Sequence, residues 1–248
     1  MAFSLLSFFF VTTAVPAVEN VPASVHDWEV LWAKVLQKNV DESGRIDFES
    51  LTRDHFDLDR VVAFIAANAP SNKPNMFPGR VSELAYYINA YNALAMYGVV
   101  DAGLPTSLGG FSKFTFFYLR KFSIGEKSIS LYDFENDIIR PMGEERVHFA
   151  LNCMVVSCPR LPRTAFVASE LDRQLDTATR SFIAERRNVT IDPNKRTLSL
   201  SAIFEFYTQD FLAHAPNLIA YINNYRSEKI SQDFKVKFLN YNWTVNKR

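Results

Sequence analysis

The chain has 248 residues, of which 48% are hydrophobic and 14% aromatic, and its 27 basic and 27 acidic residues give a formal net charge of zero. This length and apolar content suit one folded domain with a large core. Because the charges balance and no basic run stands out, the sequence argues against a protein that binds nucleic acid.

The first residues predict export. Residues 2–11, AFSLLSFFFV, are apolar and precede the small-residue segment TTAVPA. This order is typical of a secretory signal peptide, which we place at residues 1–17. No Lys or Arg precedes the apolar stretch, as one would in an ordinary signal peptide, so a buried N-terminal strand is the alternative. The stretch is too short to span a bilayer comfortably, and no later segment is apolar enough. We therefore expect a periplasmic or secreted protein, without stable membrane insertion after signal removal.

Residues 18–25 are predicted to be a linker, and residues 26–248 a single globular, monomeric domain. Apolar residues at helical spacing predict helices over residues 26–40, 56–69 and 80–100, and IDFESL at residues 46–51 a short extended piece. The 80–100 helix is apolar nearly all round, which predicts burial inside the domain.

Asn89 and Asn92 lie three apart on that buried helix, hence on one face. Buried amides must find hydrogen-bond partners, so these two either tie a loop down or line a cavity. The hydroxyls of Tyr87 and Tyr91 have the same two interpretations.

The later elements alternate between short strands and helices. A hairpin turning at Gly125–Glu126 precedes a helix over residues 131–140, capped by Ser130 and carrying Glu135 and Arg140. A mid-helix glutamate is usually solvated, with function as the alternative. The remaining segments predict helices over residues 169–187, 201–212 and 215–225 and strands over residues 197–201 and 235–243. The fold class is therefore α+β, a largely helical single domain around a small, mainly antiparallel sheet.

Residues 146–161, RVHFALNCMVVSCPRL, hold both cysteines of the chain. The apolar alternation of Val147, Phe149 and Leu151 predicts a strand, with His148, Ala150 and Asn152 on its other face.

Five segments occur in the order YYINAYNAL, ISLYDFENDIIR, RVHFALNCMVVSCPRL, LSAIFEFYTQDF and FLNYNWTVN. On these motifs the chain resembles domain of unknown function family 547, found in bacterial exported proteins and in plant proteins, from about Trp28 to Asn246. The resemblance implies a fold but no activity. The family places a Glu-His pair ahead of the helix-ending arginine. Here these positions are Glu135, Asn136 and Arg140, so that histidine is absent. Cys153 matches the general pattern and Cys158 resembles the bacterial form.

The cysteines allow three alternatives: a thiol nucleophile, a disulfide, or an inert reduced pair. A nucleophile needs a lowered thiol pKa, a base and a group that orients the base. His148 is the candidate base for Cys153, oriented by Glu135 or Asn152. Five strand residues span about 16 Å, which argues against direct contact between His148 and Cys153. No spacing supplies a complete metal site, and phosphate-loop and dinucleotide signatures are missing, so we predict no metal and no cofactor.

We expect one pocket where the Asn89/Asn92 helix, the Glu135 helix and the 146–158 segment converge. Its expected substrate-binding residues are Asn89, Asn92, Arg140, Asn152 and Cys158. The sequence hypothesis is a thiol-dependent hydrolase or acyl transferase acting on a small polar or peptide-like substrate. The alternative is a non-catalytic module that binds a small molecule, a peptide or a protein and has a structural Cys153–Cys158 pair.

Overall fold

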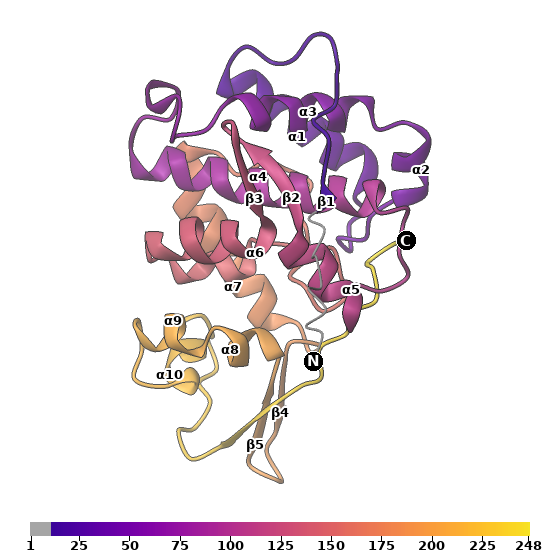
Figure 1. The fold of residues 1–248 in the computed structure, drawn as a ribbon. Coiled ribbons are helices and arrows are strands. Elements are labelled where there is room, and N and C mark those ends of the chain that lie inside the picture. Colours follow the sequence, from indigo (N-terminus) through magenta and orange to yellow (C-terminus); the bar gives the residue numbers. More distant parts are fainter. Residues whose placement is uncertain (1–10) are drawn as a thin grey trace, which may run out of the picture.

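The computed structural model describes residues 11–248 of the chain, so most of the predicted signal peptide, residues 1–10, lies outside the described residues. Most helices lie in the upper part of the molecule, those that follow residue 200 lie at its lower left, and a strand hairpin forms its lower tip (Figure 1). The fold is α+β, as the sequence predicts.

The elements are mostly helices, interrupted by a few short strands. The α-helices are α1 (Val25–Asn39), α2 (Phe48–Arg53), α3 (Phe56–Ala67), α4 (Gly79–Asp101), α5 (Phe111–Phe114), α6 (Leu131–Asp133), α7 (Leu171–Ala184), α8 (Ala202–Phe206), α9 (Thr208–Leu212) and α10 (Leu218–Asn224). The 3₁₀ and π segments are η1 (Pro74–Met76), η2 (Thr115–Leu119), η3 (Phe134–Ile139), η4 (Arg140–Met142), η5 (Glu145–Phe149) and η6 (Ala168–Glu170), of which η2 and η3 are π-helical. The strands are β1 (Val11–Thr12), β2 (Arg120–Ile124), β3 (Lys127–Ser130), β4 (Val189–Asp192), β5 (Thr197–Leu200) and β6 (Lys235–Phe238).

Helix α4 is the centre of the main core. Every residue from Leu84 to Val99 is buried, which confirms the predicted buried helix. Gly98 allows its close packing, because a Cβ there would lie 2.9 Å from the Phe122 ring of β2. The predicted helices over residues 26–40 and 56–69 correspond to α1 and α3, which pack beside α4 (Figure 1).

The predicted sheet is two small sheets. In the first, β1 pairs with β2 in parallel and β2 with β3 antiparallel; in the second, β4 and β5 are antiparallel and β5 and β6 parallel. The predicted hairpin turn is confirmed at Gly125 and Glu126, which have φ of 54° and 72°. A two-residue turn with both φ positive matches the twist of the strands it joins.

Two segments predicted to be extended are not strands. Asp47 caps α2 by accepting a hydrogen bond from the Ser50 amide, so most of the segment over residues 46–51 is helix. The segment over residues 146–152 begins in η5 and continues as loop. All of residues 147–152 are buried, so the apolar alternation does not separate a core face from a solvent face.

Residues 239–248, which we name the return segment, run from the end of β6 back to the upper part of the molecule (yellow in Figure 1). Isolated bridges join this segment to three distant parts of the chain: Ser107 with Thr244, Val155 with Val245, and Ile46 with Lys247.

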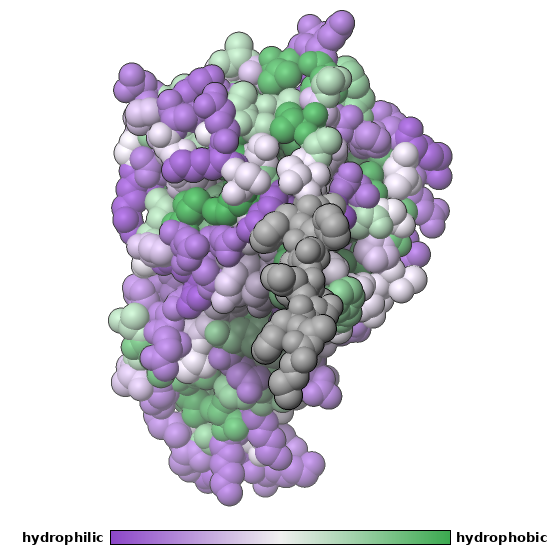
Figure 2. Space-filling model, in the orientation of Figure 1, coloured by the Kyte–Doolittle hydropathy of each residue, from purple (hydrophilic) through white to green (hydrophobic). Residues whose placement is uncertain are grey.

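The core has two clusters. One is built around α1, α3 and α4, and the other around α7–α10 and the second sheet; Tyr241 of the return segment packs against both. Hydrophilic residues cover the lower tip on the face seen in Figure 2. Among the described residues, no helix is long and apolar enough to cross a membrane.

Candidate functional site

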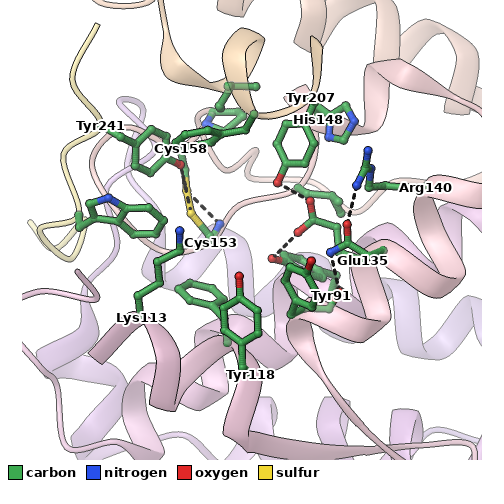
Figure 3. Close-up of a pocket in the computed structure, with 18 residues that line it drawn as sticks. Tyr91, Lys113, Tyr118, Glu135, Arg140, His148, Cys153, Cys158, Tyr207 and Tyr241 are labelled. Carbon is green, nitrogen blue, oxygen red and sulfur yellow. Dashed lines mark hydrogen bonds between the residues drawn. A yellow bond between two sulfur atoms is a disulfide. The ribbon is translucent and has the colours of Figure 1, made fainter. Parts of the chain in front are cut away.

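A cavity of about 260 Å³ lies between the two core clusters. Its walls come from η2, η3, the 151–159 loop, α8 and the return segment (Figure 3). The lining residues are Tyr91, Lys113, Phe117, Tyr118, Tyr132, Glu135, Asn136, Arg140, His148, Leu151, Cys153, Cys158, Pro159, Ile203, Phe206, Tyr207, Tyr241 and Trp243.

Glu135 supplies a buried carboxylate to this pocket. It lies on η3, is 8% exposed, and accepts hydrogen bonds from the hydroxyls of Tyr91 (3.1 Å, to Oε2) and Tyr207 (2.5 Å, to Oε1). No ion-pair partner of Glu135 is found within residues 11–248. Its two oxygens therefore each keep acceptor capacity that the described part of the chain does not use.

The two tyrosines act as fixed donors. Burial, followed by the charge of Glu135, raises the pKa of Tyr91 well above its ordinary value, and the same two causes raise the pKa of Tyr207. Both hydroxyls therefore keep their protons around neutral pH and hold the carboxylate in one orientation.

His148, Asp210 and Arg140 form a charged group beside the pocket. His148 Nε2 lies 2.8 Å from Asp210 Oδ2, and Arg140 donates from Nε and Nη2 to the two Asp210 oxygens at 2.8 Å each. The hydrogen bond from His148, with the bond and charge of Arg140, holds the pKa of Asp210 well below its usual range.

The orientation of His148 differs from the prediction. Asp210, rather than Glu135 or Asn152, holds its ring, which stacks on Tyr207 with ring centroids 3.7 Å apart. The other ring nitrogen, Nδ1, is buried and has no hydrogen-bond partner in the part of the chain that the structure describes. A buried Nδ1 has no access to a reacting proton, so the geometry does not support His148 as a general base in this conformation.

The predicted nucleophile is absent because Cys153 and Cys158 form a disulfide. Cys153 therefore carries no thiolate, and of the three alternatives for the cysteines the structure has the disulfide. Both sulfurs line the pocket, and the Tyr241 hydroxyl lies 3.3 Å from each (Figure 3).

The three asparagines predicted to bind substrate hold loops instead. Asn89 bonds both backbone groups of Phe166, and Asn92 bonds the carbonyl of Ala150 and the amide of Asn152. Asn152 in turn donates to the Pro159 carbonyl and accepts from the Met154 amide. None of the three asparagines lines the pocket, whereas the predicted Arg140 and Cys158 do.

The wall opposite Glu135 is aromatic and carries one cation (Figure 3). The Lys113 ammonium lies 4.6 Å from the centroid of the Trp243 ring and 5.9 Å from that of Phe206. Tyr118 and Tyr132 stack with centroids 4.3 Å apart. The pocket thus combines a buried carboxylate, an ammonium group and several aromatic faces.

Sequence reasoning missed Tyr207, Asp210, Tyr241 and Lys113. Tyr207 and Asp210 lie three apart in the segment LSAIFEFYTQDF, and Tyr241 lies in FLNYNWTVN, two of the five segments that carry the family resemblance. Their position as polar residues inside these segments was the signal that could have identified them as site residues. Lys113 lies in none of the five and had no such signal.

In the described range, no three His, Cys, Asp or Glu side chains cluster as a metal site would require.

Comparison with protein families gives one match. Residues 76–183 match the family model described as "Protein of unknown function, DUF547". This part of the chain is similar to the DUF547 family. The matched range includes α4, η3 and the disulfide loop, and therefore Tyr91, Glu135 and both cysteines of the pocket. Comparison with curated proteins and with solved structures gave no match.

Proposed function

We propose that this protein is a binding module whose pocket takes a small zwitterionic ligand, a free amino acid or a short peptide. The observation that carries the proposal is the Glu135 carboxylate, buried in the pocket wall between two tyrosine hydroxyls. The proposal gives the DUF547 domain a recognition role and assigns it no reaction.

A buried carboxylate without a cation is unfavourable unless hydrogen bonds or a ligand compensate the lost hydration. Tyr91 and Tyr207 supply one hydrogen bond to each oxygen, which holds Glu135 in place and leaves acceptor sites on both. The amino group of a ligand fits those sites, because an ammonium group is a donor that also brings a positive charge into direct contact, whereas Arg140 acts on Glu135 only through its charge at longer range.

The opposite wall suits the other end of such a ligand. Lys113 offers an ammonium group for a carboxylate, and the Tyr118, Trp243 and Phe206 rings offer faces for apolar atoms or for a planar peptide group. The cavity of about 260 Å³ is slightly smaller than the range of about 300–1,000 Å³ usual for small-molecule sites. This size favours an amino acid or a short peptide over a larger ligand.

Thiol-dependent hydrolysis or acyl transfer is not part of the proposal, because the Cys153 sulfur is bonded to Cys158. Export remains a proposal that rests on the apolar stretch at residues 2–11, and the mass of the mature protein tests it.

Tryptophan fluorescence provides the test. Trp28 and Trp32 are fully buried in the core, whereas Trp243 lines the pocket, so a ligand in the pocket should change the emission of Trp243 alone. We expect saturable changes on titration with free amino acids and dipeptides. N-acetylated or amidated versions should bind at least tenfold more weakly, because each lacks one charge.

Glu135→Gln should weaken binding of the same amino acids by about tenfold to a hundredfold, because the amide loses the charge that meets the ammonium group. Glu205→Gln, which changes an exposed acid on α8 outside the pocket, is the matched control and should bind normally. Equal binding by wild type and Glu135→Gln, or no saturable change with any zwitterion, would refute the proposal.

A further inference from the structure

The Cys153–Cys158 disulfide faces the cavity, whereas a structural disulfide buried in the core would not. Cys153 is partly exposed, Cys158 is 3% exposed, and both line the pocket. We propose that the Cys153–Cys158 disulfide is a thiol–disulfide exchange site that accepts electrons from a small thiol or dithiol entering the pocket. This activity is independent of the proposed amino-acid binding.

The loop does not need the disulfide to keep its shape. The return segment holds it through three backbone hydrogen bonds: Val156 N to Thr244 O (2.9 Å), Ser157 N to Asn242 O (3.3 Å) and Asn246 N to Met154 O (2.9 Å). A bond that closes so short a loop also constrains the unfolded chain much less than one that closes a long loop. Structural stabilisation therefore explains the bond poorly, and reduction should leave the two sulfurs near each other.

The hydrogen-bond donors near Cys158 Sγ can stabilise a thiolate there, which makes Cys158 suitable as the leaving group. The backbone amide of Cys153 lies 3.0 Å from Cys158 Sγ, and the Tyr241 hydroxyl lies 3.3 Å from the same atom. Burial raises the pKa of Tyr241, so this hydroxyl keeps its proton and can donate it to a thiolate. Hydrogen-bond donors and nearby cations stabilise a thiolate, and Lys113 extends into the same side of the pocket (Figure 3).

The backbone between the cysteines is strained. Met154 is fully buried and has φ of 65°, a left-handed conformation that a bulky side chain rarely adopts. Such strain collects at functional sites, where the surrounding contacts hold it. Here it sets the direction in which the chain leaves Cys153.

A thiolate of the reductant forms a bond to Cys153 Sγ while the Cys153–Cys158 bond breaks, and the electron pair leaves on Cys158 Sγ, which then takes a proton from solvent. The second thiol of a dithiol, or a second monothiol, attacks the reductant sulfur in this mixed disulfide and releases Cys153. The reductant loses two electrons and two protons, and the two cysteines gain them.

Trapping the mixed disulfide tests the assignment of the attacked sulfur. Cys158→Ser leaves Cys153 facing the pocket and should form a stable adduct with oxidised glutathione, measured by intact mass. Cys153→Ser leaves the buried Cys158, which should react at least tenfold more slowly. The reverse order of reactivity would overturn the assignment.

The rate of reduction tests the role of Tyr241. Millimolar glutathione or dithiothreitol should reduce the folded wild type, with the circular dichroism spectrum unchanged. Tyr241→Phe should slow this reduction about tenfold, because one donor to the developing thiolate is lost. Tyr225→Phe lies outside the pocket and is the control, expected to react at the wild-type rate. If the disulfide is reduced only after the protein unfolds, the proposal is overturned and the disulfide is purely structural.

Discussion

Asp210 accepts hydrogen bonds from His148 and from two nitrogens of Arg140, and its side chain is 25% exposed. These partners hold its pKa well below the ordinary value of about 3.9. A carboxyl whose pKa is lowered by folding stabilises the folded state at pH values above its unfolded pKa. That contribution is lost as the pH falls through the folded pKa.

Asp210→Asn should therefore lower the free energy of unfolding at neutral pH by about 2–3 kcal/mol, since it removes the charge that pairs with a buried histidine and an arginine. The difference from wild type should be constant above about pH 4 and should shrink at lower pH. Urea unfolding at a series of pH values measures both effects.

Asp176→Asn is the matched control for Asp210→Asn. Asp176 pairs with Arg180 one turn away on the exposed face of α7, where such pairs contribute about 0.3–0.5 kcal/mol. Equal losses for the two variants would mean that the His148–Asp210–Arg140 group has no special role in stability.

At the scale of single residues, the sequence predicted what lies near the pocket better than what each side chain does. Glu135, Arg140, His148 and the cysteines were named correctly as pocket residues. Their partners were not, because Tyr207 is 72 positions from Glu135 and Asp210 is 62 from His148. Hydrogen bonds over such separations leave no trace in local spacing.

At the scale of elements, α4 holds two loops through its buried asparagines, and one of these loops leads into the pocket. Asn92 bonds two backbone groups of the 150–152 segment, which has no strand partner of its own. The side-chain amide thus supplies the donor and the acceptor that a neighbouring strand would otherwise supply.

Asn92→Ala should lower the free energy of unfolding by about 2–4 kcal/mol, because the carbonyl of Ala150 and the amide of Asn152 would stay buried without partners. Chemical denaturation measures the loss. The exposed Asn240→Ala should change stability by less than about 0.5 kcal/mol. A mild effect at Asn92 would indicate that water replaces its amide.

Hydrophobic periodicity predicted α1, α3, α4 and the β2–β3 hairpin because each of these has a regular pattern of apolar residues or a characteristic turn. The periodicity failed at residues 146–152. Residues 147–152 are all buried, so the alternation of apolar and polar residues does not distinguish a buried face from an exposed one. Periodicity also failed at α2 because the Asp47 cap outweighed the tendency of a short apolar piece to extend.

At the scale of the whole molecule, the return segment joins the two core clusters. It contributes Tyr241 and Trp243 to the pocket and buries Val245 among residues of the upper cluster. The pocket combines residues from Tyr91 to Trp243, and no single-sequence pattern links positions so far apart.

Removal of residues 239–248 should lower the melting temperature by about 10 °C or more, because the buried Val245 and the partly buried Tyr241 and Trp243 are lost, and a fully buried side chain of this kind contributes about 1.5–3 kcal/mol. Differential scanning calorimetry should also show a broader transition or two separate ones, since the two clusters lose a shared contact. Removal of residues 247–248 alone is the control. An unchanged, single sharp transition in the longer deletion would show that the clusters are coupled elsewhere.

The return segment supplies the last pocket residues to be synthesised. Residues 241 and 243 are made after every other part of the pocket wall, so a nascent chain that has already folded α4 and η3 still lacks Tyr241 and Trp243 of the aromatic wall. The complete pocket therefore forms only when the return segment has taken its place. During that interval the cysteines face a cavity that is open to solvent, which gives an oxidant direct access to both sulfurs before the wall closes over them.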